Sequence, residues 1–347
     1  KKLNYTVSGS DLIKSKFTKK LEENDINLNY SHDPKNIINS SLIVKSSAIK
    51  DDNLEIIEAY KLNIPIFHRS EILNYIINLH KNSIGILGTH GKGTVTGSII
   101  NCLESNSYNV NYSVGGILIN KKNNFCIKNK KDYFVAEIDE SDGSFLNLNL
   151  DYILVNNLSV DHMDYFKTFS NLLNCFSSYI NNNKFKKIYL NLSDEGCIKL
   201  YEKIINKNNV ISFGFSNSFN YNGEIISLKK PYSINYKFSY FNFMKRIFKT
   251  QLSGNFNINN LIGSLALSVD LGCDIYNLDS AIEKYEGLED RFTTKFKSSI
   301  SFTKVYAHHP TEINLILKSF VNNDNVKIIA IYEPFGSKKF FDSVSVE

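Results

Sequence analysis

The sequence is short of several residue types, and each shortage excludes a class of protein. It has no tryptophan, two methionines, five prolines and five cysteines in 347 residues. The cysteines are odd in number and form no Cys-x-x-Cys pair, which argues against a disulfide framework and a zinc site and favours a reducing compartment. No apolar run reaches the roughly 18 residues of a membrane span, and the N-terminus carries no signal-peptide pattern. We therefore expect a cytoplasmic protein without membrane association.

The charge of the chain is nearly balanced. Forty basic residues face 35 acidic ones, for a net charge of +5, and they are spread along the chain. Nucleic-acid-binding proteins usually concentrate basic residues in one patch, so we expect no nucleic-acid partner. Hydrophobic residues make up 42% of the chain and charged residues 22%, which is typical of a globular protein with buried cores.

Short β-branched segments alternate with helical patterns, which indicates βαβ units and a parallel sheet. Strands are predicted at residues 3–7, 41–44, 64–67, 83–87, 133–138, 152–156 and 187–190. Helices are predicted at residues 13–23, 54–62, 71–79, 94–103, 257–271 and 278–285. Residues 223–252 alternate and are rich in aromatics, which favours an antiparallel addition to the sheet. After residue 290 the pattern restarts, with strands near 305 and at 326–332 around a helix at 311–320.

The strongest local motif is Gly88-Thr89-His90-Gly91-Lys92-Gly93-Thr94, between a hydrophobic strand and a helix. Such a turn points backbone N–H groups and a helix N-terminus at an anion, and the lysine can reach the outer phosphates of a nucleotide. The motif departs from the strict GxxxxGK[ST] pattern, because Ile86 stands where the first glycine would be and Gly93 where the hydroxyl residue would be. A glycine-rich turn without a ligand is the alternative interpretation.

Two polar clusters follow later predicted strands. The first runs from Glu137 to Asp142 and the second from Asn157 to Asp164, with Asp161 and His162 in its centre. Either cluster alone is typical of a solvated loop. Since the carboxyl ends of parallel strands meet at one edge of a sheet, we expect both clusters to lie near the glycine-rich turn. Oxygen ligands beside phosphates suit Mg²⁺.

With these motifs in order, the chain resembles the Mur ligases, the ATP-dependent amide ligases of peptidoglycan synthesis. Within that family it most resembles the member that adds L-alanine to UDP-N-acetylmuramate. The resembling pieces run in family order over nearly the whole chain: Ser8 to Asp11, Ser46 to Ile49, Ile64-Pro65 with Arg69 and Glu71, Gly88 to Lys92, Glu137 to Phe145, Asn157 to Asp164, Asn257 with Asn260, Arg291-Phe292, and Tyr306 to Glu312.

The resemblance implies an α/β fold in three domains: a UDP-sugar-binding domain over residues 1–80, a P-loop-type ATP-binding domain over 81–290 and a Rossmann-like domain from 291. The first glycine-rich turn of the UDP-binding domain is missing, and the last domain is truncated at 347. We interpret the chain as either a fragment of a longer protein or a decayed enzyme. The oligomeric state stays open.

The resemblance also implies roles for individual residues, with ATP and Mg²⁺ as cofactors and UDP-N-acetylmuramate and L-alanine as substrates. Lys92 would contact the outer phosphates, with Gly88, Thr89, His90, Gly91, Gly93 and Thr94 forming the rest of the phosphate loop. Glu137 and His162 would bind the metal ions, and Asn257 and Asn260 would flank the adenine. Arg291 would reach the γ-phosphate, and His308 would line the acceptor side. Ser10, Ser46 and Arg69 would contact the UDP part.

Several positions depart from the family pattern. Gly93 replaces a metal-binding threonine, and Phe256 replaces a histidine beside the adenine-side asparagine. Lys304 and Val305 replace two acidic residues, of which the second is expected to bind the ATP ribose. These departures leave three alternatives: the L-alanine ligase, a related ligase that recycles a tripeptide, and a degenerate protein that binds nucleotide or UDP-sugar without turnover. A P-loop ATPase acting on nucleic acid fits less well.

Overall fold

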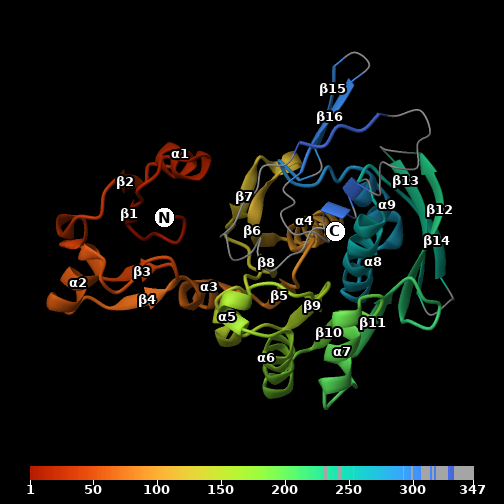
Figure 1. The fold of residues 1–347 in the computed structure, drawn as a ribbon, viewed down its shortest axis with the longest axis horizontal. Coiled ribbons are helices and arrows are strands. Elements are labelled where there is room, and N and C mark those ends of the chain that lie inside the picture. Colours follow the sequence, from red (N-terminus) through yellow and green to blue (C-terminus); the bar gives the residue numbers. More distant parts are fainter. Residues whose placement is uncertain are drawn as a thin grey trace. The chain divides into compact units, whose positions relative to one another are not determined.

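The computed structural model describes residues 1–229, 233–240, 244–252, 254–291, 293–297, 300–305, 313–314, 316–317 and 327–331. The chain forms two compact units (Figure 1). Unit 1 contains Lys1–Leu79 and the short segment Ser144–Leu148, and unit 2 contains His80–Gly143 and Asn149–Glu347. Among the described residues, no helix combines the length and the apolar character needed to cross a membrane.

Unit 1 is built from short parallel strand pairs and helices. Strand β1 (Ser8–Ser10) pairs with β2 (Asn27–Asn29), and β3 (Ile43–Lys45) pairs with β4 (Ile66–His68). The helices are α1 (Lys16–Glu23), η1 (Pro34–Ile37), α2 (Leu54–Lys61), α3 (Arg69–Ile77) and η3 (Ser144–Asn147). Side chains at the N-caps of α1, α2 and α3 accept backbone N–H groups, which fixes where each helix begins.

Unit 2 is organised around a ten-stranded sheet in the order β14-β13-β12-β11-β10-β9-β5-β8-β6-β7. Its strands are β5 (Asn82–Leu87), β6 (Val110–Leu118), β7 (Asn123–Cys126), β8 (Tyr133–Glu137), β9 (Tyr152–Val155), β10 (Lys187–Asn191), β11 (Val210–Gly214), β12 (Tyr221–Lys229), β13 (Ser233–Tyr240) and β14 (Met244–Thr250). The run from β6 to β12 is parallel, whereas β7, β13 and β14 are antiparallel to their neighbours. A separate hairpin joins β15 (Thr293–Lys297) to β16 (Ile300–Lys304).

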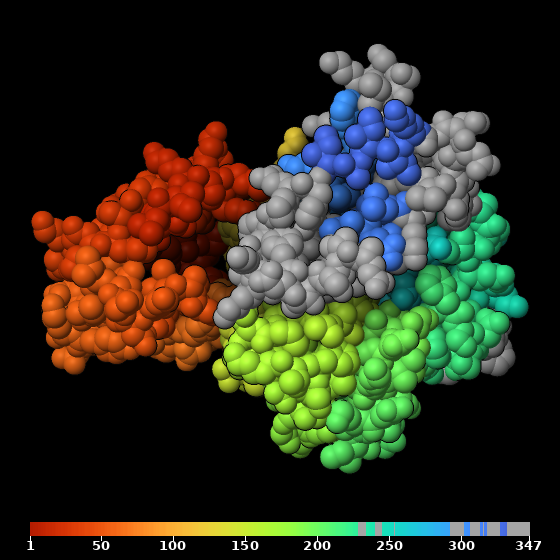
Figure 2. Space-filling view, in the orientation of Figure 1, coloured from red at the N-terminus to blue at the C-terminus, as the bar shows by residue number. Residues whose placement is uncertain are grey.

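Helices cover both faces of this sheet. The main hydrophobic core joins the sheet to α4 (Lys92–Ser105), α8 (Asn255–Asp270) and α9 (Ile275–Glu283), and Tyr189 of β10 belongs to it. Ile188 and Leu190, on either side of Tyr189 in β10, are buried on the opposite face of the sheet, because successive side chains of a strand point to opposite faces. The second face carries α6 (Phe169–Asn182) and α7 (Glu195–Lys203), preceded by α5 (Met163–Phe166). From α6 to β12 the chain forms one continuous part of the surface of unit 2 (Figure 2).

The predicted α/β class with a large, mostly parallel sheet is confirmed, as is the antiparallel addition within residues 223–252. The strand predicted at residues 3–7 is wrong: pairing begins at Ser8, opposite Asn27, and Tyr5 and Val7 are exposed. Residues 327–331 form neither a strand nor a buried segment, so the buried strand predicted there is also wrong. None of these residues pairs with a strand of the described sheets. The division into three domains stays a prediction.

Helix α8 is fixed at its C-terminal end by Asp270. The two carboxylate oxygens of Asp270 accept hydrogen bonds from the hydroxyls of Tyr221 and Tyr189, both at 2.8 Å, and Lys187 Nζ lies 2.8 Å from the carboxylate. A negative charge at a helix C-terminus is unfavourable by itself, so these partners are needed. Burial and the charge of Asp270 raise the pKa of Tyr189, which stays a hydrogen-bond donor.

Replacing this carboxylate tests how firmly α8 is held. We expect Asp270→Ala to lower the free energy of unfolding by about 2–4 kcal/mol, because two tyrosine hydroxyls lose a charged acceptor. Urea unfolding of the variant measures this loss. Glu202→Ala, which removes an exposed carboxylate from α7, is the matched control. Equal stability of the two variants would contradict the anchoring role.

Candidate nucleotide and metal site

Three loops of unit 2 leave the same edge of its sheet. Strand β5 lies between β8 and β9 and runs parallel to both. The glycine-rich turn follows β5, the acidic cluster follows β8, and the second polar cluster follows β9. Ligands of open α/β sheets bind outside the carboxyl ends of the strands, at points where the strand order reverses. The predicted convergence of the three motifs is therefore confirmed.

The glycine-rich turn presents the N-terminus of α4. Gly91 is the residue before the helix, with a φ of 78° that favours glycine, and no side chain caps the helix there. A Cβ atom at Gly91 would lie 2.7 Å from Asn260 Oδ1 and 2.9 Å from Asn156 Nδ2. The turn is thus closely packed against Asn260 and Asn156, while the backbone N–H groups at the start of α4 suit an anion.

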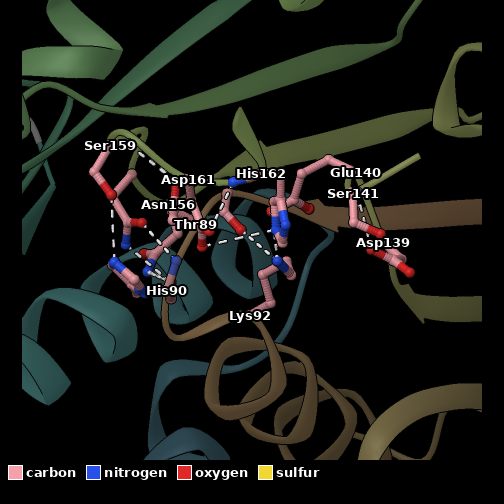
Figure 3. Close-up of polar contacts among 12 residues, drawn as sticks. Thr89, His90, Lys92, Asp139, Glu140, Ser141, Asn156, Ser159, Asp161 and His162 are labelled. Atoms are coloured by element: carbon pink, nitrogen blue, oxygen red, sulfur yellow. Dashed lines mark hydrogen bonds and ion pairs between the residues drawn. The ribbon is translucent and has the colours of Figure 1, made fainter. Parts of the chain in front are cut away.

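Asparagine side chains hold the turn in place (Figure 3). Asn157 accepts a hydrogen bond from the backbone N–H of His90 at 2.7 Å, and its amide donates to the His90 carbonyl at 2.8 Å. Asn156 Nδ2 donates to the same carbonyl at 2.9 Å and to Asn260 Oδ1 at 2.7 Å. Asn260 in turn donates to Asn257 Oδ1 at 3.1 Å. Neutral amides therefore tie the turn to β9 and α8 without adding charge near the phosphate position.

A second contact joins the turn to the loop after β9. The backbone N–H of Ser159 donates to Thr89 Oγ1 at 3.0 Å, and Ser159 Oγ lies 3.3 Å from His90 Nε2. The two loops therefore form one hydrogen-bonded surface.

Lys92 is the cationic centre of the site. Its ammonium donates to the Gly88 carbonyl at 2.6 Å and to Glu140 Oε1 at 2.7 Å. The Lys92 side chain is 13% exposed and that of Glu140 only 2%, so this ion pair is largely shielded from water. His162 Nε2 lies 3.7 Å from Glu140 Oε1 and 3.7 Å from Asp161 Oδ2. In Figure 3 the side chains of Lys92, Glu140 and His162 point toward one another.

His162 stands in a negative environment. Burial lowers the pKa of its imidazole, but the Glu140 carboxylate, as acceptor and negative charge, and the charge of Asp161 outweigh that effect and raise the pKa above its usual value. The residue has a φ of 55°, in the left-handed region, and precedes the short helix α5. In this strained backbone conformation the imidazole ring faces Glu140 and Asp161.

Glu137 approaches the first turn of α4 from β8. Its Oε2 accepts the backbone N–H of Gly115 at 2.7 Å. A Cβ atom at Gly93 would lie 3.1 Å from the same oxygen. The predicted metal ligand therefore lies directly beside the position where the hydroxyl residue of a phosphate loop is missing.

The residues fit a divalent cation whose coordination shell is completed by phosphate oxygens. In the described part of the chain, no three His, Cys, Asp or Glu side chains are gathered tightly enough to hold a metal ion by themselves. Mg²⁺ commonly binds through one or two carboxylates, with substrate phosphates and waters as its other ligands. Glu140 Oε2 is buried and has no hydrogen-bond partner among the described residues, so an acceptor oxygen is available here.

The structure places the other predicted residues as follows. Thr94 is half-buried in the first turn of α4. Arg291 donates its backbone N–H to the Leu288 carbonyl at 3.3 Å, and Leu288 packs against Gly93 and Gly116. The segment before Arg291 therefore lies next to the start of α4. His308 and Phe292 lie outside the described residues.

The three predicted UDP contacts belong to unit 1. Ser10 ends β1, Ser46 follows β3 and Arg69 begins α3 directly after β4, so all three stand at carboxyl ends of parallel strands. Ser10 Oγ donates to the buried Glu55 at 2.6 Å and lies 3.3 Å from His32 Nδ1. Their role as UDP contacts stays a prediction.

Sequence reasoning missed the individual importance of Glu140, Asn156 and Asn157. Asn156 and Asn157 directly follow β9, and Glu140 lies three residues after the end of β8; such polar residues after strands are the available signal. Which of several neighbouring acids turns inward depends on the path of the loop after β8, and the sequence pattern does not contain that path. The sequence pattern places Asn156 at the end of a predicted strand, and this position does not indicate a support of the glycine-rich turn.

Solved structures of similar fold agree with this architecture. The UDP-N-acetylmuramate-alanine ligase of Thermotoga maritima superposes with a TM-score of 0.78 at 24% identity, covering 90% of this chain and 71% of the other. A murein peptide ligase from Psychrobacter arcticus gives a TM-score of 0.76 at 20% identity, covering 91% and 71%. At these identities the likeness concerns the fold.

Sequence comparisons extend the likeness to the family. The Mur ligase middle domain matches residues 86–268, and the model described as "Mur ligase family, catalytic domain" matches residues 1–81. A UDP-N-acetylmuramate--L-alanine ligase from Rickettsia canadensis is 31% identical over 342 residues, covering 96% of this chain and 71% of the relative. The enzyme of that name from Brachyspira hyodysenteriae is 33% identical over 336 residues, covering 96% and 72%. The chain belongs to the Mur ligase family.

Proposed function

We propose that the chain is an ATP-dependent ligase that joins L-alanine to the lactyl carboxylate of UDP-N-acetylmuramate in peptidoglycan synthesis. The observation that carries the proposal is the position of Lys92 at the start of α4, with Glu137, Glu140 and His162 around it. The relatives at 30% identity or more bear the name of this activity. ATP and Mg²⁺ are the cofactors that such a site accepts.

The reaction proceeds in two steps. An oxygen of the lactyl carboxylate attacks the γ-phosphorus of ATP, ADP leaves, and an acyl phosphate forms. The amine of L-alanine then attacks the acyl carbon, inorganic phosphate leaves, and the amine loses a proton to give the amide. Phosphorylation is needed because a carboxylate oxygen is a poor leaving group. Both steps concentrate negative charge, so positioning and electrostatic stabilisation dominate catalysis.

The residues of unit 2 divide these tasks. The backbone N–H groups at the start of α4 and the ammonium of Lys92 bind the outer phosphates. Glu137 and His162 hold the divalent cation, which neutralises charge on the transferring phosphoryl group when it is bound. Asn257 and Asn260 flank the adenine, and Asn260 also supports the phosphate loop through Asn156.

The remaining roles follow from the family. Ser10, Ser46 and Arg69 contact the UDP part in unit 1, where they stand at strand ends. Arg291 reaches the γ-phosphate, and His308 lines the acceptor side. A cytoplasmic location is part of the same proposal, since nucleotide and UDP-sugar are supplied there.

Two alternatives keep a specific motivation. The fold is also similar to that of a murein peptide ligase, which motivates a ligase that accepts a tripeptide. Gly93 and Val305, in place of a hydroxyl and an acidic residue, motivate a protein that binds nucleotide without turnover.

A phosphate-release assay separates the three possibilities. We expect release from ATP and Mg²⁺ in the presence of UDP-N-acetylmuramate and L-alanine, and none when a tripeptide replaces L-alanine. Lys92→Met should lower the rate about 100-fold or more, because one charged contact to the phosphates is lost. Release with the tripeptide but not with L-alanine would establish the recycling activity. Nucleotide binding without release in either mixture would establish the inactive binder.

Gly93 offers a gain-of-function test. Gly93→Thr places a hydroxyl beside Glu137, and we expect the Mg²⁺ concentration at half-maximal rate to fall about 3- to 10-fold, because Mg²⁺ gains an oxygen ligand. Glu137 and Leu288 must give way by a few tenths of an ångström to admit the new Cβ. Gly93→Val has nearly the same shape without the hydroxyl and is the control. An equal change in both variants would refute the hydroxyl explanation.

Gly91 tests the packing of the phosphate loop. We expect Gly91→Ala to weaken nucleotide binding about tenfold, because alanine is strained at this φ and its Cβ would displace Asn260 and Asn156. Gly272→Ala carries the same backbone strain at a φ of 87°, with its closest neighbour 3.7 Å away. Titration with ATP should show normal affinity for this second variant. Normal affinity in both would mean that the loop does not bind nucleotide.

A further inference from the structure

Glu140 is a buried carboxylate that uses only one of its two oxygens. Oε1 lies 2.7 Å from Lys92 Nζ and 3.7 Å from His162 Nε2. Oε2 is buried, and the described part of the chain offers it no hydrogen-bond partner. Nearly all buried polar side-chain atoms in proteins have a partner, so an oxygen without one is an acceptor position that a ligand can fill.

Lys92 has two competing partners. In this structure its ammonium is held by the Gly88 carbonyl and Glu140. A phosphate loop uses the same ammonium to contact the outer phosphates of the nucleotide. When Lys92 turns to those phosphates, Glu140 loses its counter-charge, and an unpaired carboxylate in a buried position is strongly unfavourable. A cation that arrives with the nucleotide removes this conflict.

We propose that Glu140 is a further ligand of the divalent cation, and that it exchanges Lys92 for this cation when nucleotide and metal bind. The inference rests on the proposed function only in so far as the nucleotide brings phosphates and a cation to the site. The free Oε2 becomes a metal ligand beside His162, and Lys92 is released to the phosphates. Cation binding and phosphate binding are thereby coupled through one carboxylate.

The exchange predicts how the metal alone binds to variants. Mn²⁺ without nucleotide is the probe, and its affinity is measured by electron paramagnetic resonance for the unaltered chain, Lys92→Met, Glu140→Gln and the double variant. We expect Lys92→Met to bind Mn²⁺ about tenfold more tightly than the unaltered chain, because both oxygens of Glu140 become available. The double variant should lose this entire gain. Equal Mn²⁺ affinity of Lys92→Met and the double variant would overturn the proposal, as would an unchanged affinity in Lys92→Met.

Two controls keep the result interpretable. Glu202→Gln makes the same change of charge at an exposed position of α7 and should leave Mn²⁺ affinity unchanged. Thermal unfolding shows whether each variant is folded. If Glu140→Gln alone does not fold, the comparison of Lys92→Met with the double variant still decides, because the double variant buries no unpaired charge.

The outcome is separate from that of the ligase assay. The probe is a metal ion without substrates, so the Mn²⁺ result is independent of whether the chain joins L-alanine to UDP-N-acetylmuramate. Tighter Mn²⁺ binding by Lys92→Met, lost in the double variant, would support the role of Glu140. If the chain then released no phosphate, the proposed function would be overturned and the role of Glu140 would stand. Phosphate release with no effect of Glu140 on Mn²⁺ would do the reverse.

Discussion

Because β5 pairs in parallel with β8 on one side and β9 on the other, three polar loops leave the sheet at the same edge. Every contact of the candidate nucleotide site depends on this arrangement. Lys92 begins α4 after β5, Glu140 comes from the loop after β8, and His162 from the loop after β9. His90 and Asn157 are 67 positions apart, and Thr89 and Ser159 are 70 apart, yet each pair is hydrogen-bonded, so no local motif carries the site alone.

The site separates neutral support from charged function. The glycine-rich turn is held by the amides of Asn156 and Asn157, and Asn260 supports Asn156; these amides contribute hydrogen bonds but no net charge. Charge is confined to Lys92, Glu140 and their neighbours. In a buried setting each of these charges needs a counterpart, so the arrival or departure of one charged group must be balanced by another. In the proposed exchange at Glu140, this requirement ties metal binding to phosphate binding.

The sequence predicted the parts of the molecule that depend on local patterns. Hydrophobic runs before Gly88, after Lys131 and before Asn156 predicted the three central strands, and the glycine-rich motif predicted the turn that precedes α4. Long-range effects were missed. β6 contains Gly115 and Gly116 and has a poor strand pattern, yet its first half pairs with β8, and Leu118 beyond the glycines pairs with β7. Similarly, the inward turn of Glu140, next to an exposed Asp139, follows from the path of the loop and not from residue type.

Helix α8 joins two fixed points of unit 2. Asn260 meets the phosphate loop near one end, and Asp270 is bound by two tyrosines and a lysine at the other. Ten residues of α-helix span about 15 Å, so α8 acts as a rigid spacer between the candidate nucleotide site and the parallel sheet's junction with its antiparallel extension. Removing one residue between these points would turn the helix by about 100° and carry Asn260 away from Asn156 while Asp270 stayed bound. The length of this helix is therefore as constrained as the identity of the residues at its ends.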